Sequence, residues 1–231
     1  QIPSNTIHRE CFVPSEGHVF LISDFSGQEL AIMAVGSGQE DWLEILRGGG
    51  DLHQATADKI GVPRSVAKQI NFAIAYGGGP DIIALKANIS VEEATQALHG
   101  WKRTNSRLYN WLKSNGRKAV AELASYSFMG RYRKLGYMGE ENWRIKNQGM
   151  NNPVQSTGAD MSKLSMLYLY KFHREIKIIH CLHDELVCEI REDLAKQGLG
   201  WLNESMSWAC TKVLGEPLSK PDSKIAKNWK K

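Results

Sequence analysis

Two short acidic segments, each following an apolar run, most strongly limit what this chain can form. Asp24 follows the run 18–22 and Asp184 follows the run 176–182, and both runs have the composition of strands. Carboxylates that end two strands so far apart in the sequence can converge if both strands belong to one sheet. The sequence therefore predicts a sheet built from both ends of the chain.

Converged carboxylates repel one another unless a cation lies between them, and oxygen ligands of this kind suit Mg²⁺ or Mn²⁺. Two such ions about 3.5–4 Å apart support in-line phosphoryl or nucleotidyl transfer. Taken alone, Asp24 or Asp184 is more simply explained as a solvated turn residue at a strand end. Only the remaining motifs decide between the two interpretations.

Charge and composition narrow the class of protein without choosing a function. The 231 residues carry a formal net charge of +4, which permits a nucleic-acid partner but does not require one. No apolar run approaches the roughly 18 residues of a membrane span, and the four cysteines have no metal-ligand spacing. These features favour a reduced intracellular setting without a membrane partner, and we expect the cytoplasm of a bacterium or of a phage-infected host.

Apolar periodicity and breakers predict an α+β fold: a small antiparallel sheet flanked by helices and interrupted by a helical subdomain. We expect strands near 18–24 and on both sides of the 183–185 turn, which would form a hairpin, and a short extended segment at 217–225. The residues 125–147 have an irregular pattern. Helices are expected at 26–35, 51–61, 63–76, 80–87, 91–115, 154–172 and 192–213.

A stripe of cations and aromatic residues runs along the predicted helix 63–76. Arg64, Lys68, Phe72 and Tyr76 recur every four residues, so they form one slowly turning face. Two cations followed by two aromatic rings match a nucleotide, with phosphates at one end and sugar and base at the other. A solvated helix face with partly buried aromatic residues is the alternative. The opposite face carries the apolar residues Ile70, Ala73 and Ile74.

With these segments, the chain strongly resembles the polymerase domain of family A DNA polymerases, the group of bacterial DNA polymerase I and its phage relatives. Five motifs occur in the family's order. They are Asp24–Leu30, Arg64–Gly77, Phe128–Arg131, Asn151–Asp160 and His183–Val187. The opening Gln1-Ile2-Pro3 is similar to the family's linker upstream of the first motif, so the resemblance covers nearly the whole chain.

The resemblance implies template-directed DNA synthesis, in which a dNTP is added to a primer 3′-hydroxyl. It implies a palm in two parts, 1–48 and 148–231, with fingers at 49–147 and no thumb. Primer–template DNA and dNTPs would be the partners. Two Mg²⁺ ions, or Mn²⁺ in their place, would be the cofactors.

The family's catalytic residues fall on matching positions of this chain. Asp24 and Asp184, helped by the backbone carbonyl of Phe25, would bind the metal ions. Lys68 would neutralise the triphosphate and protonate the leaving pyrophosphate. Glu185 would be an auxiliary catalytic acid rather than a firm ligand.

Further positions would bind the dNTP and the DNA. Arg64 and His53 would hold the β- and γ-phosphates, although a lone histidine is more often structural. Phe72 would stack near the deoxyribose, and Tyr76 would lie at the template side of the nascent pair. Glu29 would be the steric gate that excludes a ribose 2′-hydroxyl, beside Gln28. The residues expected to contact DNA are His183, Gln155, Asn151 and Arg131.

Several positions depart from the family's pattern. The family usually has Gln-Ile where this chain has Gly27-Gln28, and Arg where it has Ala31. The stretch between Gly61 and Arg64 is short, so we expect trimmed fingers. Phe72 in place of Tyr implies strong discrimination against dideoxynucleotides.

The resemblance also points to partners outside this sequence. The family's thumb precedes the position where this chain starts, and Gln1 lies within a linker-like segment. We therefore expect a second polypeptide or an upstream segment to supply the thumb, and an exonuclease where one is present. A thumb supplies many of the phosphate contacts that give DNA affinity.

Two other functions remain alternatives. A single-subunit RNA polymerase shares a related palm, but Glu29 at the gate position argues against it. A non-catalytic DNA-binding or scaffolding subunit has no physical need for the paired Asp24 and Asp184. The basic segment 101–118 either tracks template phosphates or is a solvated helix face. Trp42, Trp101, Trp111, Trp143 and Trp201 are expected to be packing residues.

Overall fold

The computed structural model describes residues 6–137 and 141–229, and the Gln1-Ile2-Pro3 segment lies outside these residues. The backbone contacts divide the chain into two compact units. Unit 1 comprises residues 1–28 and 158–231, and unit 2 comprises residues 29–157. Because each unit is compact by itself, each is described separately, and the division into palm and fingers at residues 48 and 147 stays a prediction.

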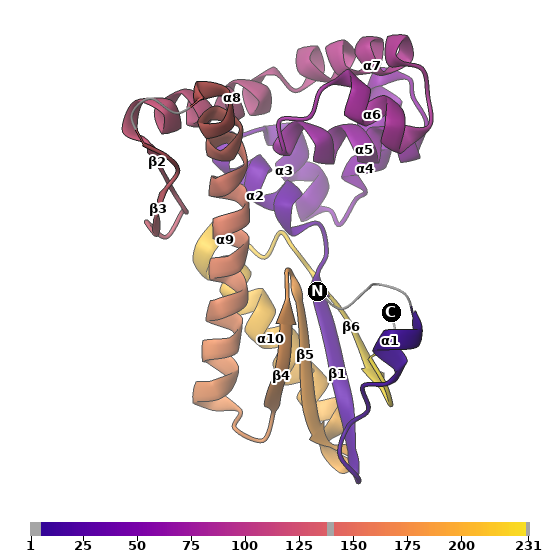
Figure 1. Ribbon diagram of the computed structural model, residues 1–231. Coiled ribbons are helices and arrows are strands. Elements are labelled where there is room, and N and C mark those ends of the chain that lie inside the picture. Colours follow the sequence, from indigo (N-terminus) through magenta and orange to yellow (C-terminus); the bar gives the residue numbers. More distant parts are fainter. Residues whose placement is uncertain (1–5, 138–140, 230–231) are drawn as a thin grey trace. The chain divides into compact units, whose positions relative to one another are not determined.

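Unit 1 contains a four-stranded antiparallel sheet of order β4-β5-β1-β6 (Figure 1). Its strands are β1 (His18–Phe25), β4 (Lys177–Leu182), β5 (Glu185–Arg191) and β6 (Pro221–Ala226). The strands β1 and β5 are direct neighbours, so the two acidic segments belong to one sheet. The predicted hairpin around 183–185 is confirmed as β4–β5, and the small antiparallel sheet is confirmed with it.

The two faces of this sheet are covered by different parts of unit 1. The helix α10 (Ala195–Leu214), which follows the 3-10 turn Glu192–Leu194, packs on one face. A Cβ at Gly198 would lie 3.0 Å from Leu21, so a glycine permits this close approach. The opposite face forms an apolar cluster of Phe20, Ile22, Val187 and Trp229. This alternation follows from the two-residue period of strands.

Unit 2 is mainly helical, with one short hairpin. Its helices are α2 (Gln28–Ser37, whose first residue belongs to unit 1), α3 (Glu40–Arg47), α4 (Leu52–Ile60), α5 (Arg64–Ala75), α6 (Pro80–Ala87), α7 (Val91–Thr104) and α8 (Ser106–Glu122). The strands β2 (Ala124–Tyr126) and β3 (Tyr132–Lys134) form the hairpin. The expected single helix 91–115 is wrong, because Asn105 leaves the helical conformation and separates α7 from α8.

The helix α9 (Asn142–Phe172) is longer than the sequence predicts. We expected a helix to begin after Pro153, but α9 continues through this proline, which lacks the N–H for one backbone hydrogen bond. Glycines allow α9 to lie close to α8, because a Cβ at Gly149 would clash with the Ala119 side chain. The first turns of α9 therefore pack against α8. Local sequence signals alone did not predict that these turns are helical.

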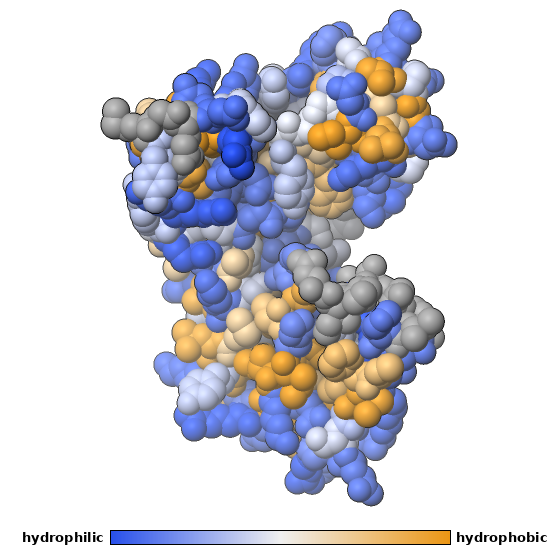
Figure 2. Space-filling model, viewed as in Figure 1, coloured by the Kyte–Doolittle hydropathy of each residue, from blue (hydrophilic) through white to orange (hydrophobic). Residues whose placement is uncertain are grey.

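Some apolar side chains are exposed at the surface, and the tryptophans differ in their burial. None of the helices that the structure describes combines the length and apolar character needed to cross a membrane. Figure 2 shows apolar side chains over the α6–α7 region, where Ile82, Leu85 and Val91 are exposed. Trp42 and Trp101 are buried packing residues as predicted, whereas the prediction for Trp143 is wrong, because this side chain is 62% exposed.

Candidate active site

In unit 1, the backbone brings the two predicted metal-binding aspartates to adjacent strand ends. The N–H of Phe25 donates to the carbonyl oxygen of Asp184 over 3.2 Å, so residues 25 and 184 form a hydrogen-bonded pair just before the first residue of β5. Asp24 and Asp184 are both partly exposed. The convergence predicted from the strand ends is therefore present in the backbone of one sheet.

The turn that carries Asp184 has a defined backbone conformation. Leu182 pairs with Glu185, so His183 and Asp184 form a two-residue hairpin connection. His183 has φ +56°, in the left-handed region that few non-glycine residues adopt. Its carbonyl oxygen accepts a hydrogen bond from Ser162 Oγ of α9 at 3.3 Å. The His183 side chain is exposed, which suits the predicted DNA contact.

Glu185 differs from the two aspartates in its surroundings. It pairs directly with Asp24, so both side chains lie on the same face of the sheet. Glu185 is only 3% exposed, and Trp229 Nε1 donates to its Oε1 over 2.8 Å. Arg9 Nη1 lies 3.6 Å from the same oxygen. Glu185 therefore has internal partners on the face that it shares with Asp24.

A third carboxylate lies on this face and was missed by the sequence analysis. Asp222 of β6 pairs with Asp24 on the side opposite Glu185. These residues help to line a hollow of about 370 Å³, together with Ile22, Ser223 and Lys224. No sequence signal identifies Asp222, because its place depends on the β1–β6 register.

The donor chemistry at the neighbouring ends of β1 and β5 suits a divalent cation. Asp24 and Asp184 offer carboxylate oxygens at neighbouring backbone positions, and hard cations such as Mg²⁺ take oxygen ligands. Among the described residues, no group of three or more His, Cys, Asp and Glu side chains is arranged to hold a metal ion. The fit therefore rests on the two aspartates and on nearby backbone carbonyls.

In unit 2, the predicted stripe lies on the accessible side of α5. Arg64, Lys68 and Tyr76 are exposed and Phe72 is partly exposed, whereas Ile70, Ala73 and Ile74 are buried. Tyr76 is the cap residue that follows the helix. The apolar face predicted from the sequence is thus the packed one, and the cations and aromatic rings remain available to a ligand.

Asp51 and Asn71 hold the residues around Arg64, at the N-terminal end of this stripe. The Asp51 side chain caps α4 by accepting from the His53 N–H at 2.8 Å, and it also accepts from Arg64 Nε at 2.6 Å. Asn71 Nδ2 lies 3.1 Å from His53 Nδ1, and Trp101 Nε1 donates to Asn71 Oδ1 over 2.7 Å. Since an amide N–H₂ only donates, Nδ1 of His53 accepts and Nε2 carries the proton.

The pKa of His53 is lowered from its ordinary value. Burial is the main cause, because it disfavours the charged imidazolium. The negative charge of Asp51 raises this pKa, while the cations Arg64 and Lys68 lower it. His53 therefore presents a neutral ring with an N–H donor, beside a partly exposed Phe72 whose ring centroid lies 5.5 Å away.

Glu29, Tyr76 and Gln155 form a second polar group within unit 2. Tyr76 Oη donates to Glu29 Oε1 over 2.6 Å, and Gln155 Nε2 donates to Tyr76 Oη over 2.9 Å. Gln155 also hydrogen-bonds to Glu29. Glu29 Oε2 is buried, and it has no hydrogen-bond partner in the part of the chain that the structure describes. Three residues predicted separately are thus brought together.

The remaining predicted positions have other surroundings. Gln28 is 7% exposed, and its Nε2 donates to the Gly158 carbonyl at 3.3 Å, so its amide is engaged inside unit 1. Arg131 Nη2 donates to the Ser156 carbonyl oxygen over 2.6 Å. Asn151 Nδ2 is buried without a hydrogen-bond partner among the described residues.

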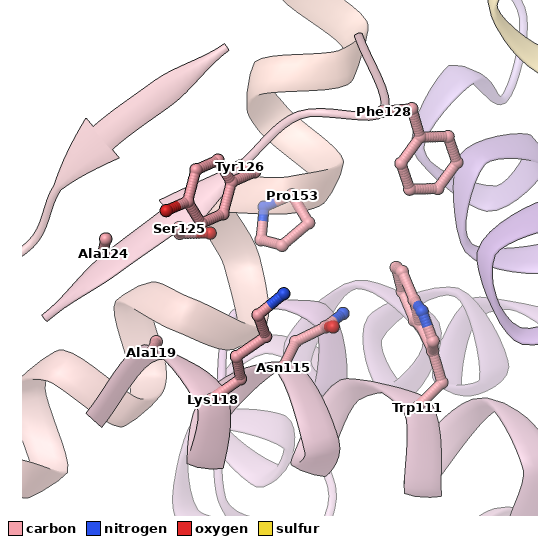
Figure 3. A pocket seen from close by; sticks show the side chains of 9 residues that line it. All are labelled: Trp111, Asn115, Lys118, Ala119, Ala124, Ser125, Tyr126, Phe128 and Pro153. Carbon is pink, nitrogen blue, oxygen red and sulfur yellow. The ribbon is translucent and has the colours of Figure 1, made fainter. Parts of the chain in front are cut away.

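Phe128, the first residue of the Phe128–Arg131 motif, lines a small hollow of about 150 Å³ with residues of α8 and β2 (Figure 3). The Phe128 N–H donates to Thr157 Oγ1 over 3.0 Å, which ties the motif to α9. Trp111 meets Phe128 edge to face, with ring centroids 6.3 Å apart. A Cβ at Gly36 would clash with the Trp111 ring, so this packing requires a glycine.

A larger hollow of about 330 Å³ in unit 2 combines cations with aromatic rings. Its lining includes Lys102, Tyr109, Lys113, Trp143 and Lys146. The ammonium groups of Lys102 and Lys113 lie 5.1 and 5.4 Å from the Tyr109 ring centroid. The backbone of the Gly77–Pro80 loop also borders it. The hollow therefore brings cations and aromatic ring faces together, unlike a helix face that carries only solvated charges.

The chain is similar to DNA polymerases along its whole length. The family model described as DNA polymerase family A matches residues 1–231. DNA polymerase I of Aquifex aeolicus is 30% identical over 97% of this chain and 42% of the relative. The thermostable DNA polymerase I of Thermus thermophilus is 29% identical over 86% of this chain and 26% of the relative. The DNA polymerase of Mycobacterium phage L5 is 27% identical over 98% of this chain and 36% of the relative.

A solved structure shares the fold. The polymerase domain of M. smegmatis Pol1, in complex with DNA primer-template and dNTP, has a TM-score of 0.86 and 23% identity. The match covers 99% of this chain and 44% of that chain. This chain therefore spans less than half of the length of these relatives. Because the family model covers all 231 residues, the chain belongs to DNA polymerase family A.

Proposed function

We propose that this chain is the palm and fingers portion of a template-directed DNA polymerase, with most of the palm in unit 1 and the fingers in unit 2. The observation that carries the proposal is the Phe25–Asp184 hydrogen bond, which places two carboxylate-bearing strand ends side by side. Family membership supports the same activity. The expectation that a thumb is contributed by another segment or polypeptide stays a prediction.

Asp24 and Asp184, with the Phe25 carbonyl, would hold two Mg²⁺ ions, for which Mn²⁺ is the expected substitute. When bound there, such ions activate the primer 3′-hydroxyl and neutralise charge on the attacking and leaving oxygens. Glu185 is better assigned to positioning than to metal binding, because Trp229 Nε1 donates to it and Arg9 lies 3.6 Å away.

The exposed stripe of α5 would bind the incoming dNTP. Arg64 and Lys68 present cations for the triphosphate, and His53 adds a neutral N–H donor. Phe72 would contact the sugar. Lys68 is also the group proposed to protonate the leaving pyrophosphate. In this reading the Asp51–Arg64 ion pair orients the guanidinium before the nucleotide binds.

Glu29 would exclude ribonucleotides, with Tyr76 and Gln155 fixing its carboxylate. Its unpartnered buried oxygen supports a role in contacting a ligand rather than a purely structural one. His183, Asn151 and Arg131 are proposed to contact DNA. The cationic and aromatic hollow that includes Lys102, Tyr109 and Lys113 is proposed to follow the template strand, since cations and ring faces together bind single strands.

Primer extension with Mg²⁺ tests the proposed function. Asp184→Asn should lower the extension rate by at least about a hundredfold, the scale seen when one electrostatic partner of a transition state is removed. The matched control is Asp193→Asn, because Asp193 is exposed and pairs with Arg191 in the same unit. Extension that survives Asp184→Asn unchanged would contradict the metal assignment.

The same assay separates the alternatives. A DNA polymerase incorporates dNTPs in preference to rNTPs, whereas the reverse preference would indicate an RNA polymerase. A non-catalytic subunit would bind primed DNA without extending it, even with any additional segment present.

A further inference from the structure

The carboxylate of Glu185 occupies a buried position formed by both ends of the described chain. Trp229 Nε1 donates to Oε1 over 2.8 Å, and Arg9 Nη1 lies 3.6 Å from the same atom. The Arg9 guanidinium carbon lies 4.4 Å from the Trp229 ring centroid, so the two partners also contact each other. We call Arg9, Glu185 and Trp229 the Glu185 clamp.

The Glu185 clamp is enclosed by apolar and aromatic contacts. All three of its residues are at most 6% exposed. The Trp229 ring meets Phe12 and His180 edge to face, with centroids 5.6 and 5.2 Å apart. The backbone N–H of Trp229 also donates to the Phe12 carbonyl oxygen over 3.1 Å. Several independent contacts therefore hold the tryptophan that anchors Glu185.

Glu185 lies where its anchoring can act on both aspartates. It follows Asp184 directly in the chain, and it pairs with Asp24 across β1 and β5. Because Phe25 and Asp184 form the hydrogen-bonded pair, Asp24 and Glu185 form the adjacent non-hydrogen-bonded pair, in which side chains are closest. Holding Glu185 in place therefore also holds the paired ends of β1 and β5, which carry Asp24 and Asp184.

We propose that Arg9 and Trp229 hold Glu185 as a positioning residue, which sets the geometry of Asp24 and Asp184. This inference rests on the proposed metal site of these two aspartates. A Glu185 carboxylate that turned toward a metal ion would leave the indole N–H of Trp229 without its acceptor and the buried Arg9 charge without its ion-pair partner. Stranding buried polar groups in this way is costly.

A second glutamate on the same strand and face supplies a matched control. Glu189 is 5% exposed and accepts from the Ser15 N–H at 2.8 Å, with Lys177 Nζ at 3.5 Å. It pairs with Phe20, four residues away from the acidic turn. Loss of Glu189 removes a buried carboxylate of similar type without touching the Glu185 clamp.

The test measures Mn²⁺ affinity of the purified chain by calorimetry, together with thermal unfolding. Trp229→Phe keeps an aromatic ring but removes the N–H donor, and it should weaken Mn²⁺ binding about ten- to a hundredfold, as loss of groups that orient metal ligands does. Glu185→Gln keeps an oxygen that accepts from Trp229, and it should weaken binding much less. Glu189→Ala should lower the unfolding temperature and leave Mn²⁺ affinity within about twofold.

Combining substitutions sharpens the result. If the Glu185 clamp acts as one unit, Glu185→Ala together with Trp229→Phe should weaken Mn²⁺ binding no more than Glu185→Ala alone. The opposite pattern would overturn the proposal: Glu185→Gln weakening Mn²⁺ binding as strongly as Asp184→Asn, with Trp229→Phe near wild type. An equal loss of affinity in Glu189→Ala would overturn it as well, by assigning the effect to general stability.

Failure of the proposed function gives a different signature. If Asp184→Asn leaves Mn²⁺ affinity unchanged, the metal site itself is wrong. If Asp184→Asn weakens binding but Trp229→Phe does not, only the positioning role of Glu185 is refuted.

Discussion

His53 shows how one residue's surroundings choose its protonation state. Its ring accepts a hydrogen bond from Asn71, and the Trp101–Asn71 bond fixes the amide that donates it. Burial lowers the pKa of His53 from its ordinary value of 6.5, with Asp51 opposing the shift and two cations adding to it. A neutral donor is therefore built into unit 2, beside the cations that are proposed to hold the triphosphate.

This residue predicts a pH dependence with a definite sign. The pKa of His53 is lower in the folded chain than in the unfolded chain, so the unfolded chain binds the proton more readily. The free energy of unfolding should therefore fall as the pH drops below about 6.5. Titration of His53 followed by NMR should give a midpoint below 6.5. Asn71→Asp should raise that midpoint by placing a carboxylate beside the ring, and an unchanged midpoint would contradict the assigned hydrogen bond.

At the scale of elements, the turn after β1 explains one departure from the family pattern. Gly27 has φ +64°, a conformation that is strained for any residue with a side chain, and no atom lies within 4 Å of its added Cβ. The glycine is therefore required by the backbone conformation and not by crowding. A different turn geometry would be needed for the glutamine that the family usually has here.

Gly27→Ala should lower the free energy of unfolding by about 1–2 kcal/mol, because it forces a Cβ into the left-handed region. Gly200 is the matched control: it lies inside α10, is exposed, and has no atom within 4 Å of its added Cβ. Gly200→Ala should raise the free energy of unfolding by roughly 0.5–1 kcal/mol, since alanine favours a helix interior. Urea denaturation measures both, and equal effects of the same sign would contradict the argument.

At the scale of the whole molecule, the proposed DNA binding has to come from a chain whose net charge is only +4. Unit 2 gathers three lysines, Tyr109 and the exposed Trp143 around the hollow beside the Gly77–Pro80 loop. Cations confer salt-dependent affinity, and ring faces stack on unpaired bases. Binding concentrated at this hollow would favour a template with a single-stranded extension over blunt duplex.

Replacing Lys102 and Lys113 together by alanine should therefore weaken binding of primer–template with a single-stranded extension. The slope of log affinity against log salt should become shallower by about 0.7 for each single-strand phosphate that the lysines no longer neutralise. Lys196→Ala is the control, because this exposed residue lies on α10 of unit 1. Fluorescence anisotropy measures both, and an equal weakening on blunt duplex would argue against a single-strand path.

Residue spacing was sufficient to predict several features of this protein. The strand ends at Asp24 and Asp184, the exposed stripe of α5 and the β4–β5 hairpin are all present. These features depend on local rules: a two-residue period for strands, a repeat of about four for a helix face, and turn chemistry between two apolar runs. The order of the motifs was enough to indicate the family.

Other features were decided only by the tertiary structure. Asp222 meets Asp24 through the β1–β6 register, and Glu185 is engaged by Arg9 and Trp229 from opposite ends of the chain. Pro153 stays inside α9, where Gly149 lets that helix approach α8. Each of these depends on contacts between residues far apart in the sequence, whose geometry no local pattern encodes. The sequence by itself determined which groups this protein carries, and long-range packing decided which of them meet.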